Sequence, residues 1–341
     1  MTTRFALLGA GRIGKVHARA VSGNPDAVLV AVTDAMPAAA EAIATQYGAE
    51  VRSLEAIEAA ADIDAVVICT PTDTHADLIQ RFARAGKAIF CEKPVDLSVA
   101  RVEETLAVVR ETGVPLMVGF NRRFDPDFRA LKAAIDAGRI GRVEMVSITS
   151  RDPGAPPVSY IERSGGMFRD MTIHDFDMAR WLLGEEVETV QAAASVLVDP
   201  AIGAAGDIDS ANVILVTASG RQAVITNSRR AAYGYDQRIE VLGAAGAVLA
   251  ENRHQANIQL ATAEGYTRPP LLDFFMDRYT EAYAAEIAAF IAALAAGTAP
   301  PATGEDGLMA LVLAEAALRS VAEGRVVRVA EVLGAPAGAA A

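Results

Sequence analysis

Short apolar runs alternate with longer helical patterns along the first 120 residues of the chain. The runs are nearly continuous in apolar residues, which is typical of strands buried on both faces of a parallel sheet. This alternation predicts a doubly wound α/β domain with a parallel sheet. The predicted strands are Phe5–Leu8, Val28–Thr33, Ala65–Cys69, Ala88–Cys91 and Leu116–Gly119, and the predicted helices are Ile13–Val21, Ala38–Tyr47, Leu54–Ala60, His75–Ala85 and Val99–Glu111.

The pattern changes after Phe120 to a β-rich stretch with helices inserted. The spacing of its strands and turn residues predicts an α/β domain with a large open, mostly antiparallel sheet. The predicted strands are Val143–Thr149, Thr189–Leu197, Ser210–Thr217, Arg221–Thr226, Arg238–Leu242, Ile258–Ala261 and Val326–Val329, and the predicted helices are Asp127–Ala137, Gly166–Leu183, Asp273–Ala296 and Gly304–Glu323.

The length of 341 residues favours two domains. We expect a first domain over residues 1–120 and a second over 121–333, followed by a frayed tail, 334–341, of glycine, alanine and proline. Apolar residues alternate along strands such as Val143–Thr149, so one face of the sheet covers the helices. If apolar side chains also point outward from the other face, that face needs to be covered by another protein surface. This predicts a homo-oligomer built through sheet faces, with a tetramer as the expected size.

Charge and cysteine content narrow the possible partners and location. Acidic residues outnumber basic ones 43 to 31, for a net charge of −12, which argues against binding to nucleic acid or an anionic membrane. No targeting or membrane-spanning segment is recognisable, and the only two cysteines, Cys69 and Cys91, lie in apolar runs. Both features predict a cytoplasmic protein in a reducing compartment.

A glycine-rich turn, Gly9-Ala10-Gly11-Arg12-Ile13-Gly14, follows the first predicted strand and opens the first predicted helix. This GxGxxG spacing allows a tight turn, a close approach to a pyrophosphate and close helix–strand packing. Asp34 ends the second strand 20 residues after Gly14, where an acidic side chain binds a ribose 2′-hydroxyl and repels a 2′-phosphate. We therefore expect NAD rather than NADP; the alternative is a structural turn beside a surface aspartate.

Polar residues also follow two later strands at their carboxyl ends, where ligands bind in open α/β sheets. Thr70, Pro71 and His75 lie after the third strand and are candidates for lining the dinucleotide site. The alternative is a helix-capping turn in which Thr72 or Thr74 is the cap; both descriptions can hold together.

Glu92-Lys93-Pro94 follows the fourth strand. A lysine in a cleft can lower the pKa of a substrate hydroxyl or relay its proton. The alternative is a surface lysine paired with Glu92.

Asp170 and His174 are four residues apart within a predicted helix and would share one face. A carboxylate beside a histidine orients the ring and raises its basicity, which suits a general base. A metal site formed by Asp170, His174 and Asp177 is less favoured, because no cysteine or second histidine is close in sequence. A plain ion pair on the helix surface is the other alternative.

Taken together and in this order, these segments resemble the Gfo/Idh/MocA family of NAD(P)-dependent sugar and polyol oxidoreductases, over nearly the whole chain. The pairing of Glu92-Lys93-Pro94 with Asp170 and His174 is the specific part of the likeness. A narrower resemblance is to myo-inositol 2-dehydrogenases. It rests on Gly119-Phe120-Asn121-Arg122-Arg123-Phe124-Asp125, Ser150-Arg151-Asp152-Pro153, His174-Asp175-Phe176-Asp177-Met178-Ala179-Arg180 and Tyr233-Gly234-Tyr235-Asp236.

The resemblance implies a Rossmann domain followed by an α/β domain for substrate binding and oligomerisation. It also implies a set of site residues. The catalytic residues would be Lys93, Asp170 and His174; the NAD-binding residues Gly9, Gly11, Arg12, Ile13, Gly14, Asp34, Thr70, Pro71, His75, Glu92 and Arg122; and the substrate-binding residues Lys93, Asn121, Arg122, Asp152, Asp170, His174 and Tyr235.

The implied reaction is NAD-dependent oxidation of myo-inositol to its 2-keto product, without a metal. Scyllo-inositol or a related pyranose is an alternative substrate, because some relatives carry methionine at the position of Asn121 and asparagine at that of Asp152. A non-catalytic NAD-binding regulator is a second alternative, and a metal-dependent lyase or hydrolase a third. An acid–base set is not needed by a regulator, so Lys93, Asp170 and His174 favour the enzyme.

Overall fold

The computed structural model describes residues 2–334, apart from the side chain of Glu162. Contacts within the chain define two compact units, Met1–Phe124 with Thr280–Leu311, and Asp125–Tyr279 with Val312–Ala341. The domain division predicted from the sequence stays a prediction, and the predicted frayed tail lies outside the described residues from position 335 onward.

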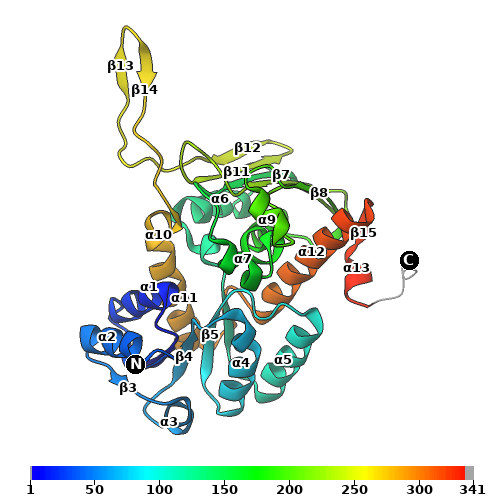
Figure 1. The fold of residues 1–341 in the computed structure, drawn as a ribbon. Coiled ribbons are helices and arrows are strands. Elements are labelled where there is room, and N and C mark those ends of the chain that lie inside the picture. The colour runs from blue at the N-terminus through cyan, green and yellow to red at the C-terminus, as the bar shows by residue number, and fades with distance from the viewer. Residues whose placement is uncertain (1, 335–341) are drawn as a thin grey trace. The chain divides into compact units, whose positions relative to one another are not determined.

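The first unit contains a six-stranded parallel sheet with the order β3-β2-β1-β4-β5-β6. Helices α1 and α2 lie on one side of these strands and α4 and α5 on the other (Figure 1). The predicted doubly wound parallel sheet is therefore confirmed. The strands are β1 (Thr3–Leu8), β2 (Ala27–Thr33), β3 (Glu50–Val51), β4 (Ala65–Ile68), β5 (Ala88–Glu92) and β6 (Leu116–Gly119), and the α-helices are α1 (Arg12–Ser22), α2 (Pro37–Tyr47), α3 (Leu54–Ala59), α4 (His75–Arg84) and α5 (Val99–Thr112).

Burial explains why these runs become strands of this sheet. Every residue of β4, β5 and β6 is buried, as in a sheet that is covered on both faces. Helix α5 ends at Gly113, whose φ of 70° is the left-handed conformation that glycine adopts readily after a helix. The two-residue edge strand β3 was not predicted, because so short a run carries no periodicity.

The chain returns to the first unit after the second sheet. Helix α11 (Thr280–Ala296) packs on α1, and the Val118 amide donates to the Ala302 carbonyl oxygen at 2.9 Å. The predicted single helix Asp273–Ala296 is wrong, since α10 (Phe275–Arg278) ends at Tyr279 before α11 begins. Arg278 and Asp125 form a buried ion pair in the second unit at this break. No sequence pattern links partners so far apart.

The second unit contains a seven-stranded sheet with the order β12-β11-β7-β10-β9-β8-β15. Only β7 and β10 pair in parallel, so the prediction of a mostly antiparallel sheet is confirmed. The strands are β7 (Val143–Arg151), β8 (Val187–Ser195), β9 (Ser210–Thr217), β10 (Gln222–Ser228), β11 (Asp236–Gly243), β12 (Gly246–Ala250) and β15 (Val327–Arg328), and the helices are α6 (Pro126–Asp136), α7 (Val158–Ser164), α8 (Ile173–Leu183), α9 (Pro200–Ala204), α12 (Gly304–Glu323) and α13 (Val329–Val332), with α12 beginning in the first unit.

Several details differ from the sequence prediction in this unit, and strand β12 and helices α7, α9 and α13 were not predicted. The predicted helix Gly166–Leu183 begins only after Gly166, whose φ of +82° is incompatible with a right-handed helix, and residues Phe168–Thr172 form a π-helical turn at its start. Strand β8 begins and ends two residues earlier than predicted. The predicted strand Ile258–Ala261 is part of a hairpin of β13 (Leu260–Thr262) and β14 (Gly265–Thr267), drawn in yellow in Figure 1.

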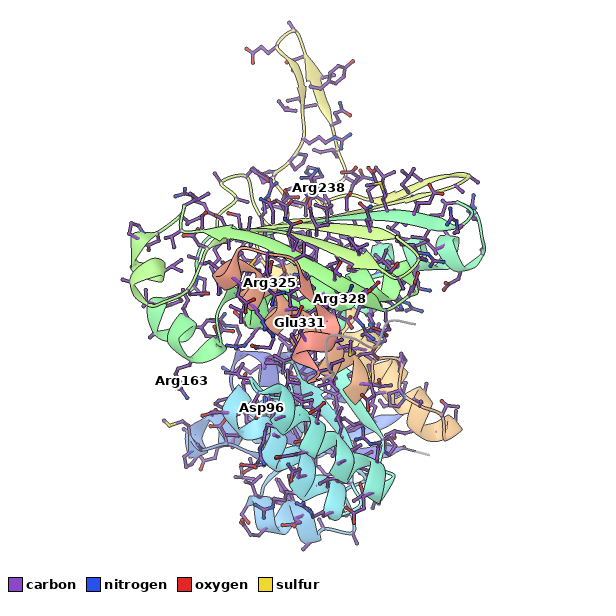
Figure 2. The ribbon with its side chains drawn as sticks, turned by 90° about the vertical axis from the view of Figure 1, so that its right-hand side faces the viewer. Asp96, Arg163, Arg238, Arg325, Arg328 and Glu331 are labelled. Carbon is purple, nitrogen blue, oxygen red and sulfur yellow. The ribbon has the colours of Figure 1, made fainter. Side chains whose placement is uncertain are left out.

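Ion pairs hold the end of the described chain. Arg325 Nη2 lies 2.7 Å from Glu331 Oε2, and Arg328 lies beside them (Figure 2). This pairing lowers the pKa of Glu331 to about 2. None of the helices in residues 2–334 is both long enough and apolar enough to span a membrane.

Candidate active site

The glycine-rich turn joins β1 to α1, and two of its glycines are required by packing. Gly9 has a φ of +97°, and a Cβ there would lie 2.6 Å from the main chain of Cys69. A Cβ on Gly14 would overlap the Gly9 carbonyl oxygen. A Cβ on Gly11 would meet no atom within 4 Å, so the turn is open on that side.

The start of α1 suits an anion. Gly11 is its N-cap and provides no side-chain hydrogen bond, and the first helical residues are Arg12 and Ile13. The first N–H groups of this 11-residue helix therefore have no side-chain cap at Gly11. Main-chain N–H groups at an open helix start bind phosphate well. The turn thus fits the pyrophosphate of a dinucleotide.

Asp34 lies against this turn at the end of β2. Its Oδ2 accepts a hydrogen bond from the Ala10 amide at 2.6 Å, and its Oδ1 accepts one from the Met36 amide at 2.7 Å. Both carboxylate oxygens are held by main-chain donors, so the side chain has a fixed orientation. The acidic residue predicted to follow Gly14 by 20 positions is therefore beside the glycine turn, where a ribose acceptor is expected.

The segment after β4 contains Thr70, Pro71 and His75. Thr74 is the N-cap residue of α4 and His75 is its first residue, as the capping alternative predicted. The Thr74 hydroxyl makes no capping hydrogen bond and donates instead to the Pro71 carbonyl oxygen at 2.7 Å. His75 is 1% exposed, with Nδ1 2.7 Å from the Pro94 carbonyl oxygen and Nε2 2.8 Å from the Thr70 carbonyl oxygen. The ring therefore joins two main-chain segments, and its assignment to the cofactor stays a prediction.

Glu92 and Lys93 follow β5. The Glu92 carboxylate is buried, with Oε1 2.6 Å from His17 Nε2 and Oε2 accepting a 3.3 Å hydrogen bond from the Lys93 amide. Lys93 is half-buried, and the Lys93–Pro94 peptide bond is cis. Of the predicted cofactor residues, Glu92 thus directs its carboxylate towards His17 in the interior of the first unit.

Three polar residues follow β6 in a single 3₁₀ turn, Asn121–Phe124. Asn121 and Arg122 are 3% and 5% exposed. The neighbouring Arg123 forms a 2.9 Å ion pair with Asp306 and donates to the Pro301 carbonyl oxygen. The structure therefore assigns Arg123 a role in packing, while Asn121 and Arg122 remain candidate ligands of the substrate and the cofactor.

Asp170 lies within the π-helical turn of the second unit. Its Oδ1 accepts a 2.9 Å hydrogen bond from the Tyr160 hydroxyl, and its Oδ2 lies 4.0 Å from Arg229 Nη1. Arg229 is 1% exposed and also lies 3.5 Å from Asp207. Sequence reasoning missed Tyr160, Arg229 and Asp207, because nothing in their local sequence marks them as partners of Asp170.

His174 is in the first turn of α8, which begins directly after the π-helical turn. Such turns are frequent at functional sites. The next residue, Asp175, is fully buried and accepts a 2.8 Å hydrogen bond from Asn227 Nδ2, while the Thr172 hydroxyl donates to Asn227 Oδ1 at 2.7 Å. These bonds fasten α8 to β10 on both sides of His174, so the histidine is on a rigid support.

The alternative metal site is not assembled. Among the described residues, the one group of three histidine, cysteine or carboxylate ligand atoms within 4.8 Å of one another is His17, Glu92 and Glu286. Asp170, His174 and Asp177 do not form such a group, and the side chain of Asp177 is fully buried.

Asp152 and Tyr235, both predicted to contact substrate, belong to loops beside β7 and β11. The Asp152 main chain is fixed, because its amide donates to Ser228 O and its carbonyl accepts from the Ala231 amide. Tyr235 is 6% exposed and packs edge-on against Tyr279, with ring centres 6.0 Å apart. Their assignment to the substrate stays a prediction.

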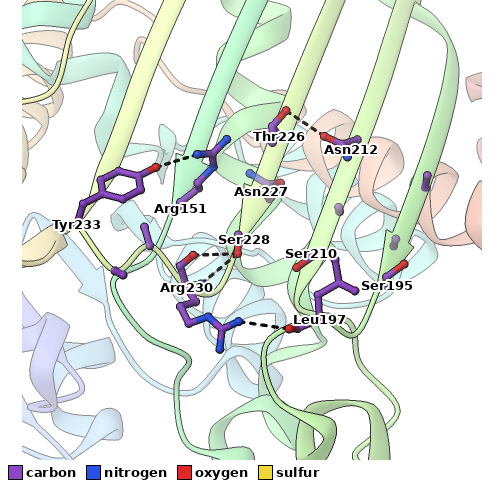
Figure 3. A pocket seen from close by; sticks show the side chains of 15 residues that line it. Arg151, Ser195, Leu197, Ser210, Asn212, Thr226, Asn227, Ser228, Arg230 and Tyr233 are labelled. Atoms are coloured by element: carbon purple, nitrogen blue, oxygen red, sulfur yellow. Dashed lines mark hydrogen bonds between the residues drawn. The ribbon is translucent and has the colours of Figure 1, made fainter.

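A hollow of about 570 Å³ lies near these loops (Figure 3). Its wall includes Thr226 and Ser228, whose side chains alternate along β10 with Asn227, which is bonded to α8. Asn227 also lines the hollow, although its side chain is bonded towards α8. We do not assign the hollow to the catalytic residues.

Comparison with known families covers both units. Residues 3–120 match the family model "Oxidoreductase family, NAD-binding Rossmann fold", and residues 128–249 match "GFO/IDH/MocA C-terminal domain". The chain belongs to the GFO/IDH/MocA oxidoreductase family. It is thus an oxidoreductase with an NAD-binding Rossmann fold, as the glycine turn and Asp34 predicted.

Members of the GFO/IDH/MocA family resemble the chain over nearly its full length. It is 72% identical to an inositol 2-dehydrogenase of Rhizobium meliloti over 97% of this chain and all of the relative. It is 45% identical to a myo-inositol 2-dehydrogenase of Thermotoga maritima, again over 97% of this chain and all of the relative. The crystal structure of a scyllo-inositol dehydrogenase from Lactobacillus casei with bound NAD(H) and scyllo-inositol matches with 30% identity and a TM-score of 0.90, covering 97% of this chain and all of the other.

Proposed function

We propose that the protein is an NAD-dependent inositol 2-dehydrogenase that oxidises myo-inositol to the 2-keto product. The observation that carries this proposal is the 72% identity to an inositol 2-dehydrogenase along the whole length of that relative. The open glycine turn and the oriented Asp34 supply the cofactor side of the reaction. A polyol substrate also suits an acidic chain with no basic stretch.

Residues of the first unit hold the cofactor in this proposal. The turn Gly9–Gly14 and the start of α1 bind the pyrophosphate, and Asp34 binds the adenosine ribose. The proposed cofactor site is completed by Thr70, Pro71, His75, Glu92 and Arg122. Of these, His75 and Glu92 contribute by holding the main chain in place. When bound, NAD⁺ supplies the acceptor for the hydride from the ring carbon.

Lys93, Asp170 and His174 carry the proton chemistry in this proposal. The His174 imidazole removes the proton of the reacting hydroxyl as a general base. Asp170, which Tyr160 and Arg229 orient, stabilises the resulting imidazolium. The Lys93 ammonium stabilises the developing negative charge on the substrate oxygen. Asn121, Arg122, Asp152 and Tyr235 bind the remaining hydroxyls of the polyol.

The test is a substrate panel followed by the absorbance of NADH. Purified protein is given myo-inositol, scyllo-inositol and simple hexoses, each with NAD⁺ and with NADP⁺. We expect the highest kcat/KM with myo-inositol and NAD⁺. Preference for scyllo-inositol or a pyranose would change the substrate and keep the class of enzyme. Binding of NAD⁺ without turnover of any polyol would favour a regulator.

The proposal includes a homotetramer in the cytoplasm. The sheet face opposite α8 exposes apolar side chains, with Met145, Ile214 and Leu242 each at least 40% exposed. Met145 and Leu242 are paired across β7 and β11, so their apolar surfaces are adjacent. A second copy of this chain is the occupant that we propose for this face.

Light scattering tests the assembly. We expect a tetramer for the unchanged protein and a smaller species for the double variant Met145→Lys, Ile214→Lys, because buried lysines oppose association. Val28→Lys is the matched control, since Val28 is equally exposed but lies on β2 of the first unit. A monomer at micromolar concentration for the unchanged protein would contradict the proposal.

A further inference from the structure

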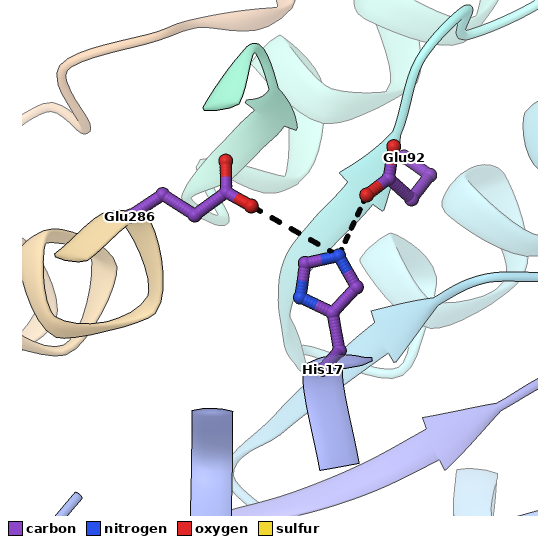
Figure 4. Close-up of side chains that lie close together, drawn as sticks. All are labelled: His17, Glu92 and Glu286. Atoms are coloured by element: carbon purple, nitrogen blue, oxygen red, sulfur yellow. Dashed lines mark hydrogen bonds and ion pairs between the residues drawn. The ribbon is translucent and has the colours of Figure 1, made fainter. Parts of the chain in front are cut away.

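Three ionisable side chains meet inside the first unit (Figure 4). His17 of α1, Glu92 of β5 and Glu286 of α11 are 0%, 8% and 0% exposed. His17 Nε2 lies 2.6 Å from Glu92 Oε1 and 4.0 Å from Glu286 Oε1. The motifs of the sequence explain Glu92 alone, so the other two need a separate explanation.

The spacing of these atoms indicates a hydrogen bond rather than a shared metal ion. Two ligands of a tetrahedral zinc lie about 3.3 Å apart when each bond is about 2.0 Å long. The 2.6 Å between His17 Nε2 and Glu92 Oε1 is too short for that arrangement, and it is ideal for a charge-assisted hydrogen bond. The imidazole N–H therefore donates to the Glu92 carboxylate.

Glu286 is a fully buried carboxyl group beside this pair. Burial and the nearby charge of Glu92 raise the pKa of Glu286 well above its ordinary value. Neither of its oxygens has a hydrogen-bond partner in the described structure. The aromatic rings of Phe90 and Tyr283 pack on His17, and the thiols of Cys69 and Cys91 are buried. The 2.6 Å contact of the ring is therefore with Glu92, whereas Glu286 lies 4.0 Å away and shares no hydrogen bond with it.

The second oxygen of Glu92 connects this cluster to Lys93. Glu92 Oε2 accepts the 3.3 Å hydrogen bond from the Lys93 amide. On the β6 side, a Cβ at Gly119 would lie 3.2 Å from the Glu92 carboxylate, so the glycine leaves just enough room for it. The carboxylate is held by His17 and by packing, and it in turn holds the main chain at Lys93.

His75 holds the other side of the same peptide. Its Nδ1 lies 2.7 Å from the carbonyl oxygen of Pro94, and its Nε2 lies 2.8 Å from that of Thr70. Both partners are carbonyl oxygens, which only accept hydrogen bonds. A neutral imidazole has one N–H and donates to only one of the two carbonyl oxygens, whereas an imidazolium donates to both. When Nδ1 carries a proton, the main chain is tied immediately before Lys93 through Glu92 and immediately after it through Pro94.

We propose that His17 and His75 are positioning residues that fix the main chain on both sides of Lys93, so that the lysine is presented to the reacting oxygen in one orientation. The proposal rests on the proposed function only for the role of Lys93 in turnover. The hydrogen bonds that hold the main chain at Lys93 do not depend on the proposed function. Misplacing a catalytic group by about 1 Å can lower the rate by about 10²-fold.

The main experiment compares His17→Leu with His17→Gln. Leucine removes the N–H donor, whereas glutamine keeps a donor on a side chain of similar reach. We expect His17→Leu to lower kcat by about 10²-fold with little change in the KM for NAD⁺, and His17→Gln to recover most of that loss. Val21→Ala, at another buried position on α1, is the control for a general loss of stability.

A double variant separates positioning from general damage. If His17 acts through Lys93, then adding His17→Leu to Lys93→Met will lower kcat no further than Lys93→Met alone. His75→Leu is expected to behave in the same way and also to raise the KM for NAD⁺, because Thr70 is a proposed cofactor residue. Losses that multiply in the double variants, or a normal kcat in folded His17→Leu, would overturn the proposal.

Hydrogen exchange makes the test independent of activity. In the protein without substrate, we expect the peptide containing Lys93 to exchange faster in His17→Leu than in the unchanged protein or Val21→Ala. If no polyol is oxidised by the unchanged protein, the proposed function fails, and this exchange still decides whether His17 holds Lys93. Unchanged exchange there would overturn the positioning role even if the enzyme is active.

Discussion

The two units hold their candidate site residues in different ways. In the first unit, the candidate cofactor site is mainly the main chain of one short turn, where packing requires Gly9 and Gly14. In the second unit, Asp170 is oriented by Tyr160 and Arg229, which come from different elements. The first arrangement depends on local sterics, and the second on side chains that folding brings together.

This difference predicts different responses to substitution. A change in the glycine turn affects the backbone, so it should reduce folding and cofactor binding together. A substitution of Asp170, His174 or Arg229 removes a proposed proton-transfer group or the partner that orients it, while the sheet beneath remains intact. Measuring turnover, cofactor affinity and thermal midpoint on the same variants therefore distinguishes the two kinds of site.

The largest effect is expected at His174. Replacing it by alanine removes the proposed general base, and loss of a general base typically costs about 10²–10⁴-fold in rate. Binding of NAD⁺, measured by fluorescence titration, should change little, because the proposed cofactor residues are in the first unit. Asp170→Asn should give a smaller loss of kcat, since it keeps the shape and loses the charge that stabilises the imidazolium. Near-normal turnover by folded His174→Ala would remove His174 from the mechanism.

The next largest effect is expected at Gly14. Alanine there overlaps the Gly9 carbonyl oxygen, so we expect destabilisation towards the upper end of the ~1–3 kcal/mol typical of overpacking. Gly11→Ala is the matched control, because its Cβ meets no protein atom within 4 Å. That variant should keep the thermal midpoint of the cofactor-free protein and bind NAD⁺ more weakly. Equal midpoints for both variants would contradict this view of the turn.

A smaller effect is expected at Asp34. Loss of a hydrogen bond to a charged group costs about 1.5–3 kcal/mol, so Asp34→Ala should raise the KM for NAD⁺ by roughly 10-fold to 100-fold. The same change removes the charge that repels a 2′-phosphate, so the ratio of kcat/KM values for NAD⁺ and NADP⁺ should fall. Equal use of both cofactors by the unchanged protein would contradict the assignment.

The smallest effect is expected at Glu286, and it depends on pH. The raised pKa means that the folded protein retains a proton there which the unfolded chain has released. The contribution of Glu286 to the free energy of unfolding is therefore fully present at low pH. It decreases as pH rises from about 4.5, the ordinary pKa, towards the raised pKa of the folded protein. Glu286→Gln stays neutral, so its thermal midpoint should match the unchanged protein near pH 4.5 and exceed it at higher pH. A constant difference between the two proteins at every pH would argue against a buried protonated carboxyl.

Local patterns in the sequence were sufficient for most of the first unit. The apolar composition of the runs that form β1, β4, β5 and β6 was enough to predict that these strands are buried. The glycine turn and Asp34 were recognisable because their geometry depends on residues close in sequence or at a regular interval. The sequence did not reveal the break at Tyr279 or the return of α11 to the first unit, because an alanine-rich helix shows no preferred face.

The sequence by itself determined the Rossmann architecture, the position of the glycine turn and the selection of Asp34 as the candidate ribose-binding residue. Each of these follows from short-range sterics and strand periodicity. Tertiary structure alone decided which side chains support the candidate catalytic residues. His17 and Glu286 meet Glu92 from two helices far apart in the chain, and Arg229 reaches Asp170 from the loop after β10. Such pairs depend on strand order and helix packing, and a buried charge shows its partner only when the low-dielectric interior has formed around both.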